Sequence, residues 1–315
     1  MKVIEVLAPG MLTTVQDLGR EGYGPLGVSA SGAADAASLR VGNRLVGNAQ
    51  GAAALEMTLL GGTFVFPDGA VIALTGSDFG AALDDVPLDM WASVAVKPGQ
   101  TLKCGATMSG ARCYLCVQGG IEVKRFLGSA STHLLSGVGG FAGRALRKGD
   151  VLHVASAKET FRMFRKKRIP DRFLAQLTPR KILRVTPGPQ ADWFTAAVQK
   201  TFHESAYRVT EEANRMGLRL EGPPIPTGVP GEMVSEGVAL GAVQIPAGGK
   251  PIVLFVEQQT TGGYPKIANV ISADFHSLGQ LRPRDEIRFE RVDWPAARAL
   301  LLEQEAVLAS GELLV

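Results

Sequence analysis

The sequence has few cysteines and no long apolar run, and both absences limit the classes of protein that fit it. Its three cysteines, Cys104, Cys113 and Cys116, are an odd number in a chain of 315 residues. A disulfide framework therefore does not fit, and a reducing compartment is expected. No stretch of about 18 uninterrupted apolar residues occurs, and the opening MKVIEVLAPG lacks the apolar core and cleavage site of a signal peptide. A cytoplasmic protein without a membrane partner is expected.

Charge and metal-ligating residues are also sparse or scattered. The 33 basic and 30 acidic residues leave a net charge of +3, which is too small a surplus to indicate a nucleic-acid partner. Cys113 and Cys116 form C-x-x-C within RCYLCVQGG, but this stretch alternates like a strand, so the two thiols should point to opposite faces. The histidines show no H-x-x-x-H spacing, and no metal site is expected. The four are His133, His153, His203 and His276.

The common nucleotide, nucleophile and biotin motifs are incomplete. Residues 137–142, GVGGFA, fit G-x-G-x-x-A, but no strand–helix–strand frame surrounds them, so a glycine-rich loop is predicted. Gly249-Lys250 resembles the end of a phosphate-binding loop, yet Pro251 stands where Ser or Thr is required. There is no G-x-S-x-G and no Ala/Val-Met-Lys-Met biotin attachment sequence, so any biotin would arrive on another protein.

What is present predicts a mainly β protein with a few helices. The 38 glycines and recurring short apolar runs, such as AVIALTG, CYLCVQGG and PIVLFVE, are typical of strands between turns. Helices are predicted at 32–45, with Ser31 as N-cap, at 192–202, and from Asp293-Trp294-Pro295 onward. A basic stretch with Arg162, Arg165, Lys166, Lys167, Arg168 and Arg172 is read as a solvated connector, an anion or nucleic-acid patch being the alternative.

Both halves open on a strand followed by Pro-Gly, VIEVLAPG and ILRVTPG, which suggests a duplicated β domain. The expected organisation is an N-terminal domain over residues 1–160, a connector over 161–180 and a C-terminal domain with a terminal helix over 181–315.

Polar clusters at strand and loop ends are the candidates for function. QQTTGGYPKI, residues 258–267, follows the apolar PIVLFVE, and such a run is costly to bury unless its polar atoms find partners. It either delivers polar groups into a pocket or forms an exposed turn. Asp17 with Arg20, Asn214 with Arg215, and Glu236 in SEG belong to similar clusters, for which caps and structural ion pairs are the alternative.

Taken in order, these stretches resemble the KipA-like, allophanate-hydrolase-subunit-2-like family over nearly the whole chain. Glu257 stands where the family usually has aspartate, which affects the reach of any site there. The segments that carry the resemblance include TTVQDLGREGYGPLGVSASGAAD, NRLVGNAQGAAALEMTLLGG, ALTGSDFGAALDDVPL, LGSASTHLLSGVGGFAGRALRKGD, TPGPQADWF, NRMGLRLEG and SEGVALGAVQIPAGGKPIVLFVEQQTTGGYPKIANVISADF.

The resemblance implies two cyclophilin-like β-barrel domains and work on a small amide. Family members include the C-type subunit of bacterial ATP-dependent 5-oxoprolinase. Together with the B-type (KipI-like) and A-type (LamB/YcsF-like) subunits, it opens 5-oxoproline to L-glutamate. ATP is then the implied cofactor, bound with or by a partner subunit. Similar modules form the biotin-dependent carboxyltransferase of urea carboxylase, and a regulatory partner of a KipI-like kinase inhibitor is a third reading.

The candidate site is placed on the segment that ends in Lys266. Thr260 and Thr261 offer hydroxyls to opposite faces if the strand persists, Gly262 and Gly263 let a backbone approach a ligand, and Lys266 can hold a carboxylate or phosphate. The predicted catalytic residues are Glu257, Thr260, Thr261 and Lys266. The predicted substrate-binding residues are Asp17, Arg20, Asn214, Arg215, Gln259, Gly262, Gly263 and Tyr264.

Overall fold

The computed structural model describes residues 2–156, 164–227 and 233–315, and its contacts divide the chain into two compact units. The first unit comprises Met1–Arg20, Ser31–Leu177 and Val307–Val315, and the second comprises Glu21–Ala30 and Thr178–Ala306. The main boundary thus falls at the end of the expected connector. Two short segments, residues 21–30 and 307–315, group with the other half of the chain, which no local composition change indicates.

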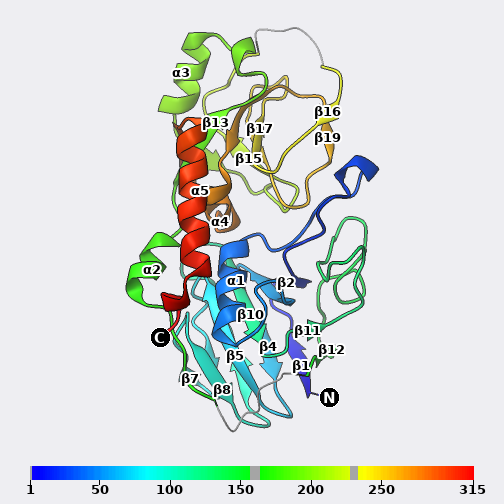
Figure 1. Cartoon of the computed structure of the whole chain (residues 1–315). Helices are drawn as coiled ribbons and strands as arrows, with labels where there is room; N and C mark the ends of the chain where they lie inside the picture. Colours follow the sequence, from blue (N-terminus) through cyan, green and yellow to red (C-terminus); the bar gives the residue numbers. More distant parts are fainter. Residues whose placement is uncertain (1, 157–163, 228–232) are drawn as a thin grey trace. The chain divides into compact units, whose positions relative to one another are not determined.

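The first unit contains two antiparallel sheets (Figure 1). The strands of the larger sheet run in the order β11-β12-β1-β4-β9-β6-β7, and those of the smaller in the order β2-β3-β10-β5-β8. Their bounds are β1 Lys2–Ala8, β2 Leu12–Gln16, β3 Ala54–Thr58, β4 Thr63–Val65, β5 Ala70–Gly76, β6 Ala82–Leu83, β7 Val86–Pro87, β8 Ser93–Val96, β9 Thr101–Lys103, β10 Arg112–Val117, β11 Ile121–Glu122 and β12 Val151–Val154.

Strand β10 is buried on both faces, and its side chains divide between two apolar clusters. Cys113 belongs to the cluster with Leu115, whereas Cys116 belongs to the one that packs with helix α1, Ala36–Leu45. The prediction that the two thiols point to opposite faces is therefore confirmed. Burial also raises the pKa of the third thiol, Cys104, to about 12, so it is a poor nucleophile.

Helix α1 begins four residues later than predicted. Asp35, not Ser31, is the N-cap: its Oδ1 accepts from the Ser38 backbone N–H at 2.9 Å. The Ser31 hydroxyl instead donates to the carbonyl of Thr132 at 2.9 Å, a contact between residues 101 apart in sequence. Both residue types cap helices well, so only the tertiary contact decides between them.

The second unit is built on a closed barrel whose strands run in the order β13-β20-β17-β18-β15-β14-β21. A separate two-stranded sheet, β16 with β19, belongs to the same unit (Figure 1). The mainly β class is confirmed. The bounds are β13 Ile182–Pro187, β14 Tyr207–Val209, β15 Gly217–Glu221, β16 Glu236–Gly237, β17 Ala242–Gln244, β18 Ile252–Leu254, β19 Thr261–Gly262, β20 Lys266–Val270 and β21 Glu286–Arg291.

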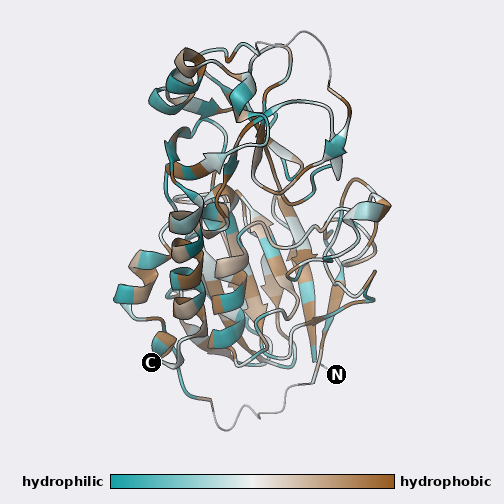
Figure 2. Ribbon diagram, turned by 45° about the horizontal axis from the view of Figure 1, so that its top comes forward, coloured by the Kyte–Doolittle hydropathy of each residue, from teal (hydrophilic) through white to brown (hydrophobic). Residues whose placement is uncertain are grey.

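The remaining helices agree with the sequence in part. The helix predicted at 192–202 is interrupted: a short 3-10 turn covers Ala191–Trp193, and α3 covers Ala196–Glu204, capped by Thr195. Helix α5, Trp294–Ala309, starts where predicted and alternates apolar and polar turns in Figure 2. Shorter helices are α2, Asp171–Gln176, and α4, Phe275–Gly279. No helix of the described ranges is both long and apolar enough to cross a bilayer.

The basic connector is tied to the first unit where it is described. The Lys166 ammonium forms an exposed ion pair with Asp89 at 2.8 Å, and the Lys167 backbone N–H donates to Ser93 Oγ at 2.8 Å. Arg162 lies outside the described residues. Exposed pairs of this kind contribute about 0–1 kcal/mol to stability, which fits a solvated connector.

Candidate functional site

A row of side chains crosses four neighbouring strands on the outer face of the second unit's barrel. Leu218 and Leu220 are buried while Arg219 between them is exposed, so Arg219 marks the outer face of β15. The strand pairing places Arg219 opposite Ile252, Ile252 opposite Gln244, and Gln244 opposite Lys266. Directly paired residues share a face, so Gln244 and Lys266 are neighbours on this surface.

A pocket of about 280 Å³ lies over this row. Its walls come from the outer faces of β15, β17 and β18, from the turn before β15, and from the segment between β18 and β20. The lining residues are Asn214, Met216, Gly217, Arg219, Gln244, Pro246, Ile252, Leu254, Gln259 and Tyr264. Three of them carry side-chain amides. Such a lining is suited to a small, planar, hydrogen-bonding ligand.

Gln244 is the buried polar group of this pocket. Its side chain is 1% exposed, and within the described residues its amide nitrogen has no hydrogen-bond partner. Gly262 lies against it: a Cβ added at Gly262 would come within 2.4 Å of that nitrogen. A buried amide without a partner costs about 1–3 kcal/mol, so its retention points to a ligand that satisfies it.

Lys266 places a positive charge next to Gln244. The residue is 2% exposed, and its ammonium donates to Glu236 Oε1 and lies 4.0 Å from the sulfur of Met233. Its backbone N–H donates to Gln190 Oε1 at 3.1 Å. The side-chain amide of Gln190 donates in turn to Glu236 Oε1 at 2.9 Å. These two hydrogen bonds to Glu236 lower the pKa of its carboxyl group, which is therefore ionised at neutral pH.

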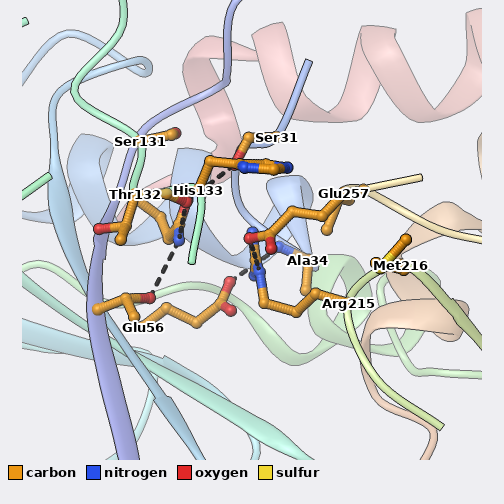
Figure 3. Close-up of polar contacts among 12 residues, drawn as sticks. Ser31, Ala34, Glu56, Ser131, Thr132, His133, Arg215, Met216 and Glu257 are labelled. Atoms are coloured by element: carbon orange, nitrogen blue, oxygen red, sulfur yellow. Dashed lines mark hydrogen bonds and ion pairs between the residues drawn. The ribbon is translucent and has the colours of Figure 1, made fainter. Parts of the chain in front are cut away.

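Arg215 and Glu257 support the wall of the pocket rather than line it. They form a buried ion pair, Arg215 Nε to Glu257 Oε1, which Figure 3 shows, with side-chain exposures of 6% and 4%. The Glu257 backbone N–H donates to the Arg215 carbonyl at 2.8 Å. Asn214 Oδ1 accepts from the Met216 backbone N–H at 2.8 Å, which fixes the turn. The longer glutamate reaches the guanidinium here, so the departure from aspartate is accommodated.

The segment between Gln258 and Tyr264 differs from the extended strand considered in the sequence. Strand β18 ends at Leu254 and a turn follows, in which the Gln258 backbone N–H donates to the Phe255 carbonyl. Thr261 then starts β19 with an exposed side chain, and Thr260 is half-buried. The two hydroxyls are therefore not presented from one continuous strand, and neither belongs to the pocket lining.

Three other residues of this segment contribute to the pocket wall. Gln259 and Tyr264 line it, and Tyr264 is 38% exposed. Gly262 packs against Gln244, so the absence of a side chain is required there. Gly263 is placed differently, because its carbonyl accepts from the Met233 backbone N–H at 3.3 Å.

Asp17 and Arg20 belong to the first unit, where they organise a loop. The Asp17 carboxylate accepts from the hydroxyls of Ser129 and Ser131, both at 2.6 Å, and from the Ala130 backbone N–H at 2.7 Å. Arg20 donates to the Ser131 carbonyl and lies over the ring of Phe126. These contacts are fully accounted for by the structure of the 129–131 loop.

A second buried polar network of the first unit surrounds Glu56. Its Oε2 accepts from the Tyr114 hydroxyl at 2.7 Å and from the Ala34 backbone N–H at 2.8 Å, the latter drawn in Figure 3. Tyr114 also accepts from the Asp35 backbone N–H at 2.7 Å. Burial and the neighbouring Glu56 carboxylate raise the pKa of Tyr114 well above its usual value. The network joins the start of α1 to the sheet.

Two groups that the sequence reading did not select complete the site: Gln190 and Gln244. Gln190 lies in the PGPQADW loop, 76 residues before Lys266, and only the barrel brings them together. Gln244 carried a weak signal, an amide at the end of the buried strand AVQ. Across residues 2–156, 164–227 and 233–315, no group of three or more His, Cys, Asp or Glu side chains could hold a metal ion.

The fold and pocket define a class of protein that matches known sequences and structures. The family described as the carboxyltransferase domain, subdomain A and B, matches residues 26–291. The chain therefore belongs to this family, which confirms the resemblance seen in the sequence.

Particular relatives fall into two groups. The chain is 39% identical to the C-type subunit of 5-oxoprolinase from Escherichia coli (strain K12) over 91% of this chain and 90% of that one, and 36% identical to its counterpart from Haemophilus influenzae over 97% and 96%. The crystal structure of Kluyveromyces lactis urea carboxylase matches 99% of this chain with a TM-score of 0.90 and 33% identity. This chain covers only 29% of that longer protein.

Proposed function

We propose that this chain is the C-type subunit of an ATP-dependent 5-oxoprolinase and that its barrel pocket binds 5-oxoproline. Support comes from the similarity to two C-type subunits over nearly their whole length. The observation that carries the proposal is the buried amide of Gln244 beside the buried ammonium of Lys266. A lactam that bears a carboxylate offers one partner to each of these groups.

The chemistry assigned to this chain is binding, orientation and polarisation. A lactam holds its N–H and C=O on the same side, so a primary amide such as Gln244 can accept from one and donate to the other. A donor held on the carbonyl oxygen stabilises negative charge that develops there when the ring is attacked. Lys266 would hold the carboxylate, and the exposed face of Tyr264 would cover the ring.

The pocket does not fit ATP. Its volume of about 280 Å³ lies below the usual range for small-molecule sites, about 300–1,000 Å³. The cation of its lining, Arg219, is already paired with Glu212 at 3.4 Å. No step that uses ATP is therefore assigned to this pocket. ATP would be bound with or by a partner, and the candidate partners are the B-type (KipI-like) and A-type (LamB/YcsF-like) subunits.

A urea-directed carboxyltransferase is the second candidate function. It is favoured by the match of 99% of this chain to urea carboxylase of K. lactis. The amides of the pocket would also suit urea, and biotin would have to arrive on another protein. Urea carries no carboxylate, however, so this function leaves the charge of Lys266 without a ligand partner.

One reconstitution experiment separates the two functions. The purified chain is mixed with candidate B-type and A-type subunits from the same source, and two activities are measured side by side. ATP-dependent release of glutamate from 5-oxoproline is expected, together with no turnover by this chain alone. Bicarbonate- and biotin-dependent carboxylation of urea, without glutamate release, would replace the proposal by the second candidate.

A further inference from the structure

The ion pair between Lys266 and Glu236 is unequal in burial. The side chain of Lys266 is 2% exposed, whereas that of Glu236 is 43% exposed. A buried ammonium loses most of its hydration and needs an anion next to it. A carboxylate that is nearly half exposed can leave the pair and recover its hydration from solvent. The two partners therefore depend on each other to different degrees, and Lys266 is the one that requires a counter-ion.

Glu236 is also held by a small element. It lies on β16, which pairs with β19 over two residues only, Glu236 with Gly262 and Gly237 with Thr261. Its side-chain contacts are with Lys266 and with the amide of Gln190. A two-residue ladder is marginal by itself, so the carboxylate can be displaced without unfolding the barrel.

The place that Glu236 occupies is next to the pocket. Gln244 faces Lys266 across the β17–β20 pair and lines the pocket. Gly262, the strand partner of Glu236, lies against the unpartnered amide nitrogen of Gln244. A ligand in the pocket that contacts the Gln244 amide therefore has its far end within reach of the ammonium of Lys266.

We propose that Lys266 is an anion subsite that Glu236 occupies in the free chain, and that the carboxylate of an incoming ligand displaces Glu236 from it. The identity of the ligand as 5-oxoproline rests on the proposed function above. The subsite itself rests on the burial, pairing and register of these residues. It selects small amides that carry a carboxylate over neutral amides such as urea.

This arrangement makes Glu236 a competitor of the ligand. Removing its charge while keeping its shape should strengthen carboxylate binding, because the ligand no longer has to displace an anion. Glu236→Gln does this, since a glutamine oxygen can still accept from Lys266 and Gln190. Removing the ammonium with Lys266→Met should abolish the preference for a carboxylate.

The test compares two ligands that differ only in the carboxylate, 5-oxoproline and 2-pyrrolidinone, by calorimetric titration of the full chain. Glu236→Gln should bind 5-oxoproline at least about fivefold more tightly than the wild type, with 2-pyrrolidinone changed by less than about twofold. In Lys266→Met the two ligands should bind with equal affinity. Glu221→Gln is the matched control, because Glu221 forms an exposed pair with Arg208 on the same barrel and should change neither affinity.

A second readout separates this inference from the proposed function. Sodium acetate should raise the melting temperature of Glu236→Gln more than that of the wild type or of Glu221→Gln, relative to sodium chloride at equal concentration. That result would support the subsite even if the reconstituted complex releases no glutamate. Equal acetate effects in all three proteins, or 5-oxoproline binding that is unchanged in Glu236→Gln, would overturn the inference while leaving the proposed function open to its own assay.

Discussion

Replacement of Gln244 by methionine should separate binding from stability. The side-chain amide nitrogen of Gln244 has no hydrogen-bond partner within the described residues and is buried. Methionine has a similar length and no polar group that must be satisfied. The exchange removes a desolvation penalty of about 1–3 kcal/mol. The free energy of unfolding should therefore stay unchanged or rise, in contrast to most buried substitutions.

The same substitution should weaken the ligand. Two neutral hydrogen bonds to a lactam contribute about 0.5–1.5 kcal/mol each, so their loss costs about 1–3 kcal/mol of binding. This corresponds to a loss of affinity of roughly 5- to 150-fold for 5-oxoproline. In the assembled complex, kcat/KM should fall by a similar factor.

The assay pairs urea denaturation with calorimetric titration on the same preparations. Gln199→Met is the control, because the Gln199 amide donates to the carbonyls of Ala191 and Phe194 at 2.8 and 3.0 Å. It should lower the free energy of unfolding by about 1–3 kcal/mol and leave ligand affinity unchanged. If Gln244→Met is destabilised by more than about 1 kcal/mol and still binds like the wild type, the amide is structural and the reasoning fails.

Two further predictions concern stability alone. Asp274 is fully buried and accepts from the backbone and guanidinium of Arg184, so Asp274→Ala should lower the free energy of unfolding by about 3–5 kcal/mol, and a loss below about 1 kcal/mol in denaturant titrations would contradict this. Hydrogen bonds from Arg144 lower the pKa of Asp150, so the pair stabilises the fold above the ordinary carboxyl pKa and loses this as pH falls through the lowered value. Melting curves between pH 7 and pH 2 should show a smaller acid-induced loss in Asp150→Asn than in the wild type, and parallel curves would refute the assignment.

Local sequence patterns were sufficient for the class of fold and for several elements. Short apolar runs between glycines predicted the strands, and Asp293-Trp294-Pro295 marked the start of α5, Trp294–Ala309. Alternation in RCYLCV predicted that Cys113 and Cys116 face different clusters. These features depend on neighbours within a few positions, which is the range over which periodicity and capping act.

The site could be predicted only in part, because its contacts are between residues far apart in sequence. Lys266 was identified from its segment, but its partners Gln190 and Glu236 lie 76 and 30 residues away and meet it only when the barrel closes. The apolar run before Gln258 suggested a longer strand, yet the pairing with Gly217 ends at Leu254 and a turn follows. Composition does not fix where a ladder stops, since hydrogen-bond partners determine it.

A crystal structure of the full chain soaked with 5-oxoproline tests the central claim most directly. The account predicts a ligand in the barrel pocket, with its lactam paired to the Gln244 amide and its carboxylate on Lys266, while Glu236 has turned away toward solvent. A lactam bound elsewhere, or bound in the pocket with the Lys266–Glu236 pair intact and the carboxylate pointing away, would contradict it.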